Sequence, residues 1–195
     1  MSLVAQEHHA QLYIGDVNTI KDPLHLKNVL RIKCLINCSC DLEFPDSPQN
    51  YDSFEFIEKR VPIENFIGVH IIPYLEQVAD YIHSMLVEHK HNILIYSFNG
   101  RSRSTTFILA YFMKIKGLTL QKALQSLSQI CPLAQPNESF MHQLMIFDQT
   151  LFGNSSTYVH IRPQTPTWVH PVHVVLVVYP QHALTVATDI PLLIS

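Results

Sequence analysis

The sequence has few charged residues and no cluster of basic ones. Asp, Glu, Lys and Arg make up 15% of the 195 residues, and the formal net charge is −3. Proteins that bind nucleic acid present basic patches to its phosphate backbone. Nucleic acid is therefore not expected as a partner.

Long apolar runs are also missing. The first eleven residues contain Glu7, His8 and His9 in place of an apolar leader core, so a cytoplasmic or nuclear location is expected. The apolar stretch at residues 172–179 is followed by Pro180. It is much shorter than the ~20 residues that a membrane helix needs. A membrane partner is therefore not expected, and a tail anchor stays open as the weaker alternative.

The spacings typical of a zinc site are absent. Of Cys34, Cys38, Cys40 and Cys131, only Cys38 and Cys40 form a closely spaced pair, and a structural zinc site normally needs a second pair or spaced histidines. The 12 histidines show no HExxH or comparable spacing. We expect reduced thiols, no metal and no cofactor.

Apolar residues make up 47% of the chain, which is enough for a packed core. The character of the sequence changes after Gly153, where prolines recur and charges almost disappear. We therefore predict one domain at residues 1–152 and a poorly ordered tail at residues 153–195, whose apolar residues 174–178 could self-associate as a β-segment.

Apolar strand patterns alternate with amphipathic helical patterns in the first 152 residues. Strands are predicted at residues 12–14, 32–38, 54–60 and 92–96, with a loop at residues 41–52. Helices are predicted at residues 22–30, 72–89, 119–129 and 137–151, and through residues 107–113 to a stop at Gly117. Asp22, Thr119 and Asn137 are the expected N-caps. This order predicts an α/β fold with a mainly parallel sheet covered by helices on both faces.

A buried strand, a short loop containing glycine, and a helix follow one another from residue 92. Amides of such a loop and the N-terminus of the helix can hold an anion, and a guanidinium can grip two phosphate oxygens. The candidate phosphate-binding residues are Ser97, Phe98, Asn99, Gly100, Arg101, Ser102, Arg103 and Ser104.

Residues 96–104, Tyr-Ser-Phe-Asn-Gly-Arg-Ser-Arg-Ser, resemble the dual-specificity phosphatase signature His-Cys-x-x-Gly-x-Ser-Arg-Ser. Residues 110–113 resemble the family's Ala-Tyr-Leu-Met, and residues 136–144 match its Pro-Asn-x-x-Phe-x-x-Gln-Leu pattern. The resemblance covers about residues 11–152. It implies the fold of the cysteine-based protein tyrosine phosphatases, with the strand, phosphate loop and helix in that order.

Three positions depart from the family pattern. Ser97 stands where the resemblance places the nucleophilic cysteine, Tyr96 replaces the preceding histidine, and Asn65 stands at the general-acid position. A serine hydroxyl ionises far less readily than a thiol, and an amide has no proton to donate. The neighbouring Glu64 is expected to point elsewhere. These departures predict a pseudophosphatase without functional catalytic residues.

The leading hypothesis is therefore a signalling module that binds phosphorylated proteins through phosphotyrosine, phosphothreonine or phosphoserine, like the phospho-Ser/Thr/Tyr-interacting pseudophosphatases. The alternatives are a scaffold or competitor that uses another surface, and a weak phosphatase. Roles other than phosphate binding or catalysis also stay open for single residues. Arg103 could tie the loop to nearby carbonyls, Arg101 could be a solvated charge, and Tyr96 could simply fill space in its strand.

Overall fold

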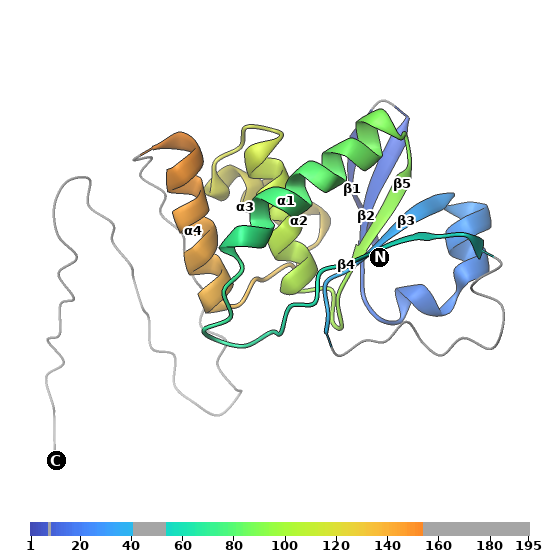
Figure 1. Ribbon diagram of the computed structural model, residues 1–195, viewed down its shortest axis with the longest axis horizontal. Helices are drawn as coiled ribbons and strands as arrows, with labels where there is room; N and C mark the ends of the chain where they lie inside the picture. The colour runs from blue at the N-terminus through green and yellow to red at the C-terminus, as the bar shows by residue number, and fades with distance from the viewer. Residues whose placement is uncertain (8, 41–53, 154–195) are drawn as a thin grey trace, which may run out of the picture.

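The computed structural model describes residues 1–7, 9–40 and 54–153. Its centre is a five-stranded sheet in the order β1-β2-β5-β3-β4 (Figure 1). The strands are β1 Ser2–Glu7, β2 Ala10–Gly15, β3 Ile32–Asn37, β4 Ile57–Arg60 and β5 Asn92–Tyr96. All neighbouring strands are parallel except β1, which runs antiparallel to β2. The predicted α/β class with a mainly parallel sheet is confirmed.

Four longer helices lie together on one side of the sheet (Figure 1). They are α1 Ile72–His83, α2 Arg103–Lys114, α3 Leu120–Ile130 and α4 Glu138–Phe152. Three short helical segments complete the described part: η1 Thr19–Lys21, η2 His25–Val29 and η4 Ser84–Glu88, of which the last two are single π-helical turns. The predicted helix at residues 72–89 is thus α1 continued by the wider turn η4.

Strand β5 lies at the centre because its side chains are apolar on both faces. Residues 93–96 are all buried, as expected for a parallel strand that is covered on both sides. In the register of the sheet, Tyr96 pairs with Gly15 of β2 and with Asn37 of β3. The carboxyl ends of three parallel strands therefore meet at one edge, which is where α/β proteins commonly place their sites.

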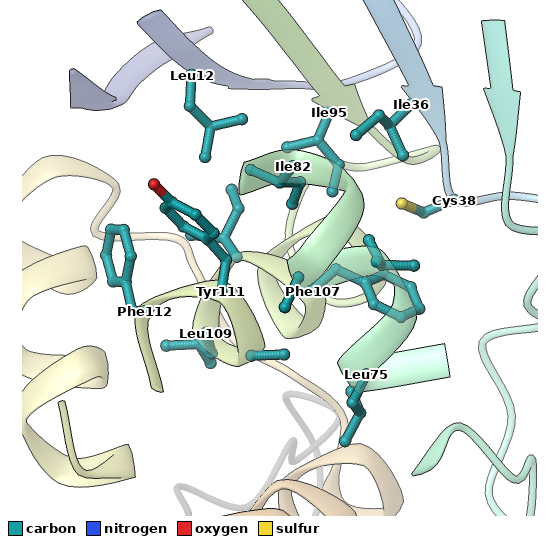
Figure 2. Packing of buried hydrophobic residues seen from close by; sticks show 14 of the residues in the cluster. Leu12, Ile36, Cys38, Leu75, Ile82, Ile95, Phe107, Leu109, Tyr111 and Phe112 are labelled. Atoms are coloured by element: carbon teal, nitrogen blue, oxygen red, sulfur yellow. The ribbon is translucent and has the colours of Figure 1, made fainter. Parts of the chain in front are cut away.

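The main core lies between the sheet and helix α2. Figure 2 shows Leu12, Ile36 and Ile95 of the strands facing Phe107 and Tyr111 of α2. Every residue of α2 from Arg103 to Met113 is buried, because α1, α3 and α4 surround it. A helix buried on all sides can be apolar all round.

The opposite face of the sheet is covered more thinly. Ile20 of η1 and Leu26 of η2 pack against a second buried cluster from the strands, which consists of Ile32, Leu35, Leu94 and Tyr96. Helical segments on both faces are confirmed, but those on this face are single turns.

Two of the three predicted N-caps make a capping hydrogen bond, and the third, Thr119, is the N-cap residue of α3 without making one. Asp22 accepts a hydrogen bond from His25 N at 2.9 Å, and Asn137 accepts one from Phe140 N at 2.8 Å. Thr119 has the extended backbone of an N-cap, but its side chain makes no capping bond. Instead, the Leu120 amide donates to Asp148 of α4 at 2.8 Å. A long-range carboxylate has replaced the local hydroxyl.

Strand β1 was not predicted. Only Val4 is fully buried in it, and the pairing with β2 shifts between Leu3 and Ala5, so the apolar alternation is broken. The predicted strand at residues 54–60 is paired only from Ile57.

Residues 8, 41–53 and 154–195 lie outside the described part of the chain. The predicted loop at residues 41–52 and almost all of the predicted tail fall there and stay predictions. Among the residues that are described, no helix combines the length and apolar character needed to cross a membrane.

Candidate phosphate-binding site

The candidate phosphate loop lies between the end of β5 and the start of α2, as predicted. Its side chains divide into two groups: Ser97, Ser102, Arg103 and Ser104 are buried, whereas Phe98, Asn99 and Arg101 are exposed. The loop ends at the N-terminus of a 12-residue helix, where backbone N–H groups and the helix dipole favour an anion.

Gly100 gives the loop its shape. Its φ is +63°, in the left-handed region where residues with a side chain are strained. A Cβ at this position would lie 2.6 Å from the backbone oxygen of Gly15, so the close approach of the loop to β2 also requires glycine. The Gly100 amide donates to Ser97 O at 3.0 Å, and Val17 N donates to Phe98 O at 3.2 Å.

Ser97 is held at the base of the loop by the first turn of α2. Its Oγ lies 3.0 Å from Ser104 Oγ and accepts a longer hydrogen bond from Ser104 N at 3.4 Å. A hydroxyl needs an adjacent base to become a nucleophile, and the Ser104 hydroxyl and amide cannot act as one. Ser97 therefore bonds the hydroxyl and the amide of Ser104, in the first turn of α2.

Arg103 is buried at the start of α2. Its Nη1 donates to Ile63 O at 3.2 Å, so the guanidinium does bond a neighbouring carbonyl, in the segment that also carries Asn65. Cys38 lies close enough to feel this charge. Burial raises the pKa of the Cys38 thiol, and the positive charge of Arg103 lowers it by less. Cys38 therefore remains a neutral thiol beside the loop and supplies no thiolate.

Asn65 joins three segments of the site. Its Oδ1 accepts a hydrogen bond from Ser102 Oγ at 2.8 Å and another from Asn137 Nδ2 at 3.0 Å. Ser102 Oγ in turn accepts from Asn137 N at 3.0 Å. Asn65 therefore contacts the loop, and Glu64 is exposed, in line with the expectation that it points elsewhere. The Ser102 hydroxyl is thus engaged by Asn65 and Asn137 and does not point to the candidate anion site as a free group.

Ser39 is a site residue that the sequence reasoning missed. Its Oγ accepts a hydrogen bond from Phe98 N at 3.1 Å, and its own amide donates to Asn37 Oδ1 at 3.0 Å. Only the two cysteines on either side of Ser39, Cys38 and Cys40, were considered from the sequence, and Ser39 was given no role. Its place just after β3 could have identified it, because β3 and β5 end at the same edge. With Phe98 N and Gly100 N both engaged, an anion would have to displace these bonds to use those two amides.

Asp16 supports the loop from the end of β2. Its Oδ1 accepts hydrogen bonds from Asn18 N, Thr19 N and Thr19 Oγ, at 2.9 to 3.0 Å. Burial acts to raise the pKa of Asp16, but these hydrogen bonds outweigh it and leave the pKa lowered. The ionised carboxylate thus fixes the turn whose Val17 amide bonds Phe98 O.

Arg101 is exposed and Tyr96 is buried, as their roles outside phosphate binding would require. Arg101 is exposed, and its Nε donates to Leu133 O at 3.3 Å. Tyr96 is fully buried in the second cluster, on the face of the sheet opposite α2. The four cysteines are free thiols.

The family model described as "Dual specificity phosphatase, catalytic domain" matches residues 12–150, which include every element of this site. The chain belongs to this family. Dual specificity protein phosphatase 14 of Mus musculus is 32% identical over 162 residues, which cover 83% of this chain and 76% of that protein. Human dual specificity phosphatase 28 is 34% identical over a shorter stretch, covering 50% of this chain and 55% of its own length.

Solved structures agree with this assignment. The crystal structure of human DUSP28 superposes with a TM-score of 0.67 at 27% identity, covering 80% of this chain and all of that one. A mouse putative dual specificity phosphatase complexed with zinc tungstate has a TM-score of 0.62 at 29% identity, covering 72% of this chain and 83% of that one. The chain therefore has the dual specificity phosphatase fold.

Proposed function

We propose that this protein is a catalytically inactive dual specificity phosphatase homologue that binds phosphorylated proteins through residues 97–104. The observation that carries the proposal is the pairing of Ser97 Oγ with Ser104 Oγ at 3.0 Å, at the base of a loop that retains Arg103 and the α2 N-terminus. The parts that can hold a phosphate are present, whereas the position of the nucleophile carries a hydroxyl that hydrogen-bonds another hydroxyl.

The position of the general acid supports the same conclusion. The Asn65 amide accepts hydrogen bonds from Ser102 and Asn137, so it orders the loop and has no proton to transfer to a leaving group. Without a nucleophile and an acid, the site can position and neutralise a phosphate but cannot complete a covalent step.

The loss of the thiolate also favours binding. A thiolate at residue 97 would repel a phosphate dianion, and a neutral hydroxyl does not. The mouse homologue solved with zinc tungstate suggests a probe, because tungstate is a tetrahedral oxyanion. We expect tungstate to raise the melting temperature of the full chain, since a ligand that binds only the folded state stabilises it.

Variants of Arg103 test the anion site. Arg103→Ala should weaken tungstate binding by about 1.5–3 kcal/mol, the usual size of a hydrogen bond to a charged group. Arg103→Lys keeps the charge but loses the bidentate fork, so it should retain part of the affinity. The exposed Arg60→Ala is the matched control and should bind like wild type. Undiminished tungstate binding by a folded Arg103→Ala variant would favour the scaffold hypothesis, in which another surface binds the partner.

The enzymatic alternative has its own test. The wild-type protein should not hydrolyse a generic aryl phosphate. Turnover that disappears in Ser97→Ala would show a weak phosphatase and overturn the assignment as inactive.

A further inference from the structure

We infer that the turn at residues 66–69 and the neighbouring Leu133 dock the apolar residues that flank a phosphorylated residue in the partner protein. This inference rests on the proposed function and adds a specificity surface to it. We call Phe66, Ile67 and Leu133 the apolar rim. Their exposed fractions are 68%, 82% and 64%, among the highest of the large apolar residues in the described part of the chain.

The first step is the shape of the turn that carries Phe66 and Ile67. Val69 N donates to Phe66 O at 3.5 Å, and Gly68 has φ +92°, as required for the third residue of a type II turn. The two apolar residues therefore occupy the first and second positions of a tight turn that projects from the segment between β4 and α1.

The second step is that both sides of this turn are anchored. On one side, Asn65 bonds Ser102 and Asn137. On the other, Val69 O accepts a hydrogen bond from Gln143 Nε2 at 2.7 Å, and within the turn Gly68 N donates to Ser139 Oγ at 3.3 Å. The apolar side chains are therefore exposed on a turn that is already fixed, so binding a partner would cost little entropy for ordering the turn.

The third step places Leu133 beside the same loop. Arg101 Nε donates to Leu133 O at 3.3 Å, and Gln135 N donates to Arg101 O at 2.7 Å. Figure 1 shows the segment between β4 and α1 passing beside the loop that joins β5 to α2. The rim and the candidate anion site thus belong to loops that hydrogen-bond directly to one another.

The fourth step is the choice of partner. The α2 N-terminus and Arg103 complement a phosphate group, and the rim complements apolar side chains at either side of it. Anionic membranes also combine phosphate with apolar groups, but they attract basic clusters, whereas this chain has a net charge of −3 and exposes Glu64 next to Asn65. A phosphorylated protein segment with large apolar flanking residues is therefore the occupant we propose.

The experiment measures binding of the full chain to matched phosphopeptides by fluorescence anisotropy. One set carries Leu or Phe on both sides of the phosphotyrosine or phosphothreonine, and the other carries Ser at the same positions. The wild-type protein should prefer the apolar set by about tenfold, or ~1.4 kcal/mol, the size expected of an interface contact that contributes to affinity without being a hot spot. Phe66→Ser with Ile67→Ser should reduce this preference to less than about twofold and leave tungstate affinity unchanged.

Leu24→Ser with Val29→Ser is the matched control. These residues are similarly exposed, at 59% and 64%, but lie at the two ends of η2, Leu24 just before it and Val29 as its last residue, on the thinly covered side of the sheet. This pair should keep the tenfold preference. A third arm presents vesicles containing a phosphoinositide, which should not compete with the peptides.

Each outcome separates the inference from the function on which it rests. The inference fails, and the phosphate site stands, if tungstate binds but peptide affinity does not depend on the flanking residues or does not change when the rim is substituted. If neither tungstate nor any phosphopeptide binds, the proposed function fails. Peptide binding that survives Arg103→Ala, or vesicles that displace the peptides, would also overturn the inference.

Discussion

Gly100 and Gly117 both have a positive φ, at +63° and +66°, but their surroundings differ. A Cβ at residue 100 would lie 2.6 Å from Gly15 O, whereas nothing lies within 4 Å of one at residue 117. We predict that Gly117→Ala lowers the free energy of unfolding by about 1–2 kcal/mol, the strain of a left-handed alanine. Gly100→Ala should cost more than that and abolish tungstate binding, because the backbone of β2 must move.

Urea unfolding and a tungstate titration of the two variants check this prediction. Equal losses of stability, with tungstate binding kept in both, would mean that the loop can move away from β2 without harm. The glycine itself was predicted as part of the loop from the sequence. The close approach of Gly100 to Gly15 was not predicted, because Gly15 is 85 residues earlier and only the parallel register brings the two together.

Ser97→Cys places a thiol against the first turn of α2, the turn that also carries Arg103. Both lower the pKa of a thiol, so the pKa should fall below the usual ~8.5. We predict rapid alkylation at neutral pH that tungstate protects against. Wild type provides the control, because any reaction at exposed Cys40 occurs in both proteins. A thiol that reacts only above its ordinary pKa would show that the loop field is absent.

Adding Asn65→Asp to Ser97→Cys supplies a carboxyl group at the acid position. Ser102 Oγ and Asn137 Nδ2 would donate to it and favour its ionised form, so its pKa should lie below the ordinary value for aspartic acid. The general-acid gain of ~10²–10⁴ in turnover should therefore appear at acidic pH and fade as the pH rises through that pKa. A gain that persists unchanged to pH 8 would contradict this geometry. Turnover of an aryl phosphate across pH measures it.

At the scale of the elements, the side chain of Gln143 of α4 hydrogen-bonds the segment between Asn65 and α1, a contact that we call the Gln143 clasp. Its Oε1 accepts from Ile71 N at 2.7 Å and Ile72 N at 3.3 Å, and its Nε2 donates to Val69 O at 2.7 Å. Gln143→Leu would leave buried backbone groups without these partners. We predict a loss of about 1–3 kcal/mol in the free energy of unfolding.

The exposed Gln121→Leu on α3 makes the same chemical change and should stay within about 0.5 kcal/mol of wild type. Urea unfolding measures both variants. A Gln143→Leu variant as stable as the Gln121→Leu control would show that the clasp is not needed.

The elements also show which features the sequence could predict. Asp22 and Asn137 were identified as N-caps because a cap acts within three residues of itself. The contacts of Asp148 with α3, of Gln143 with α1 and of Ser39 with Phe98 each join residues 28 or more apart in the sequence. Local patterns carry no information about such pairs. Strand β1 was not predicted for a different reason. Its pairing with β2 is irregular and leaves only Val4 buried, so the expected alternation of buried and exposed residues is broken.

At the scale of the whole molecule, α4 is the last described element and packs into the main core. Phe140, Leu144 and Phe147 of this helix are buried in the main core, and Gly153 ends it with a hydrogen bond from its amide to Gln149 O at 2.9 Å. The five strands and four longer helices of the described part of the chain thus all lie within residues 1–153. We predict that a protein of residues 1–153 unfolds cooperatively, at a urea midpoint close to that of the full chain.

Residues 1–136 are the control for this truncation because they stop just before α4. Burying each large apolar side chain is worth roughly 1.5–3 kcal/mol. Removing three of them, together with the Gln143 clasp, approaches the ~5–15 kcal/mol that stabilises a typical domain. This shorter protein should therefore lose cooperative unfolding. A protein of residues 1–153 that behaves like it, insoluble or without a cooperative transition, would show that residues beyond 153 contribute to the core.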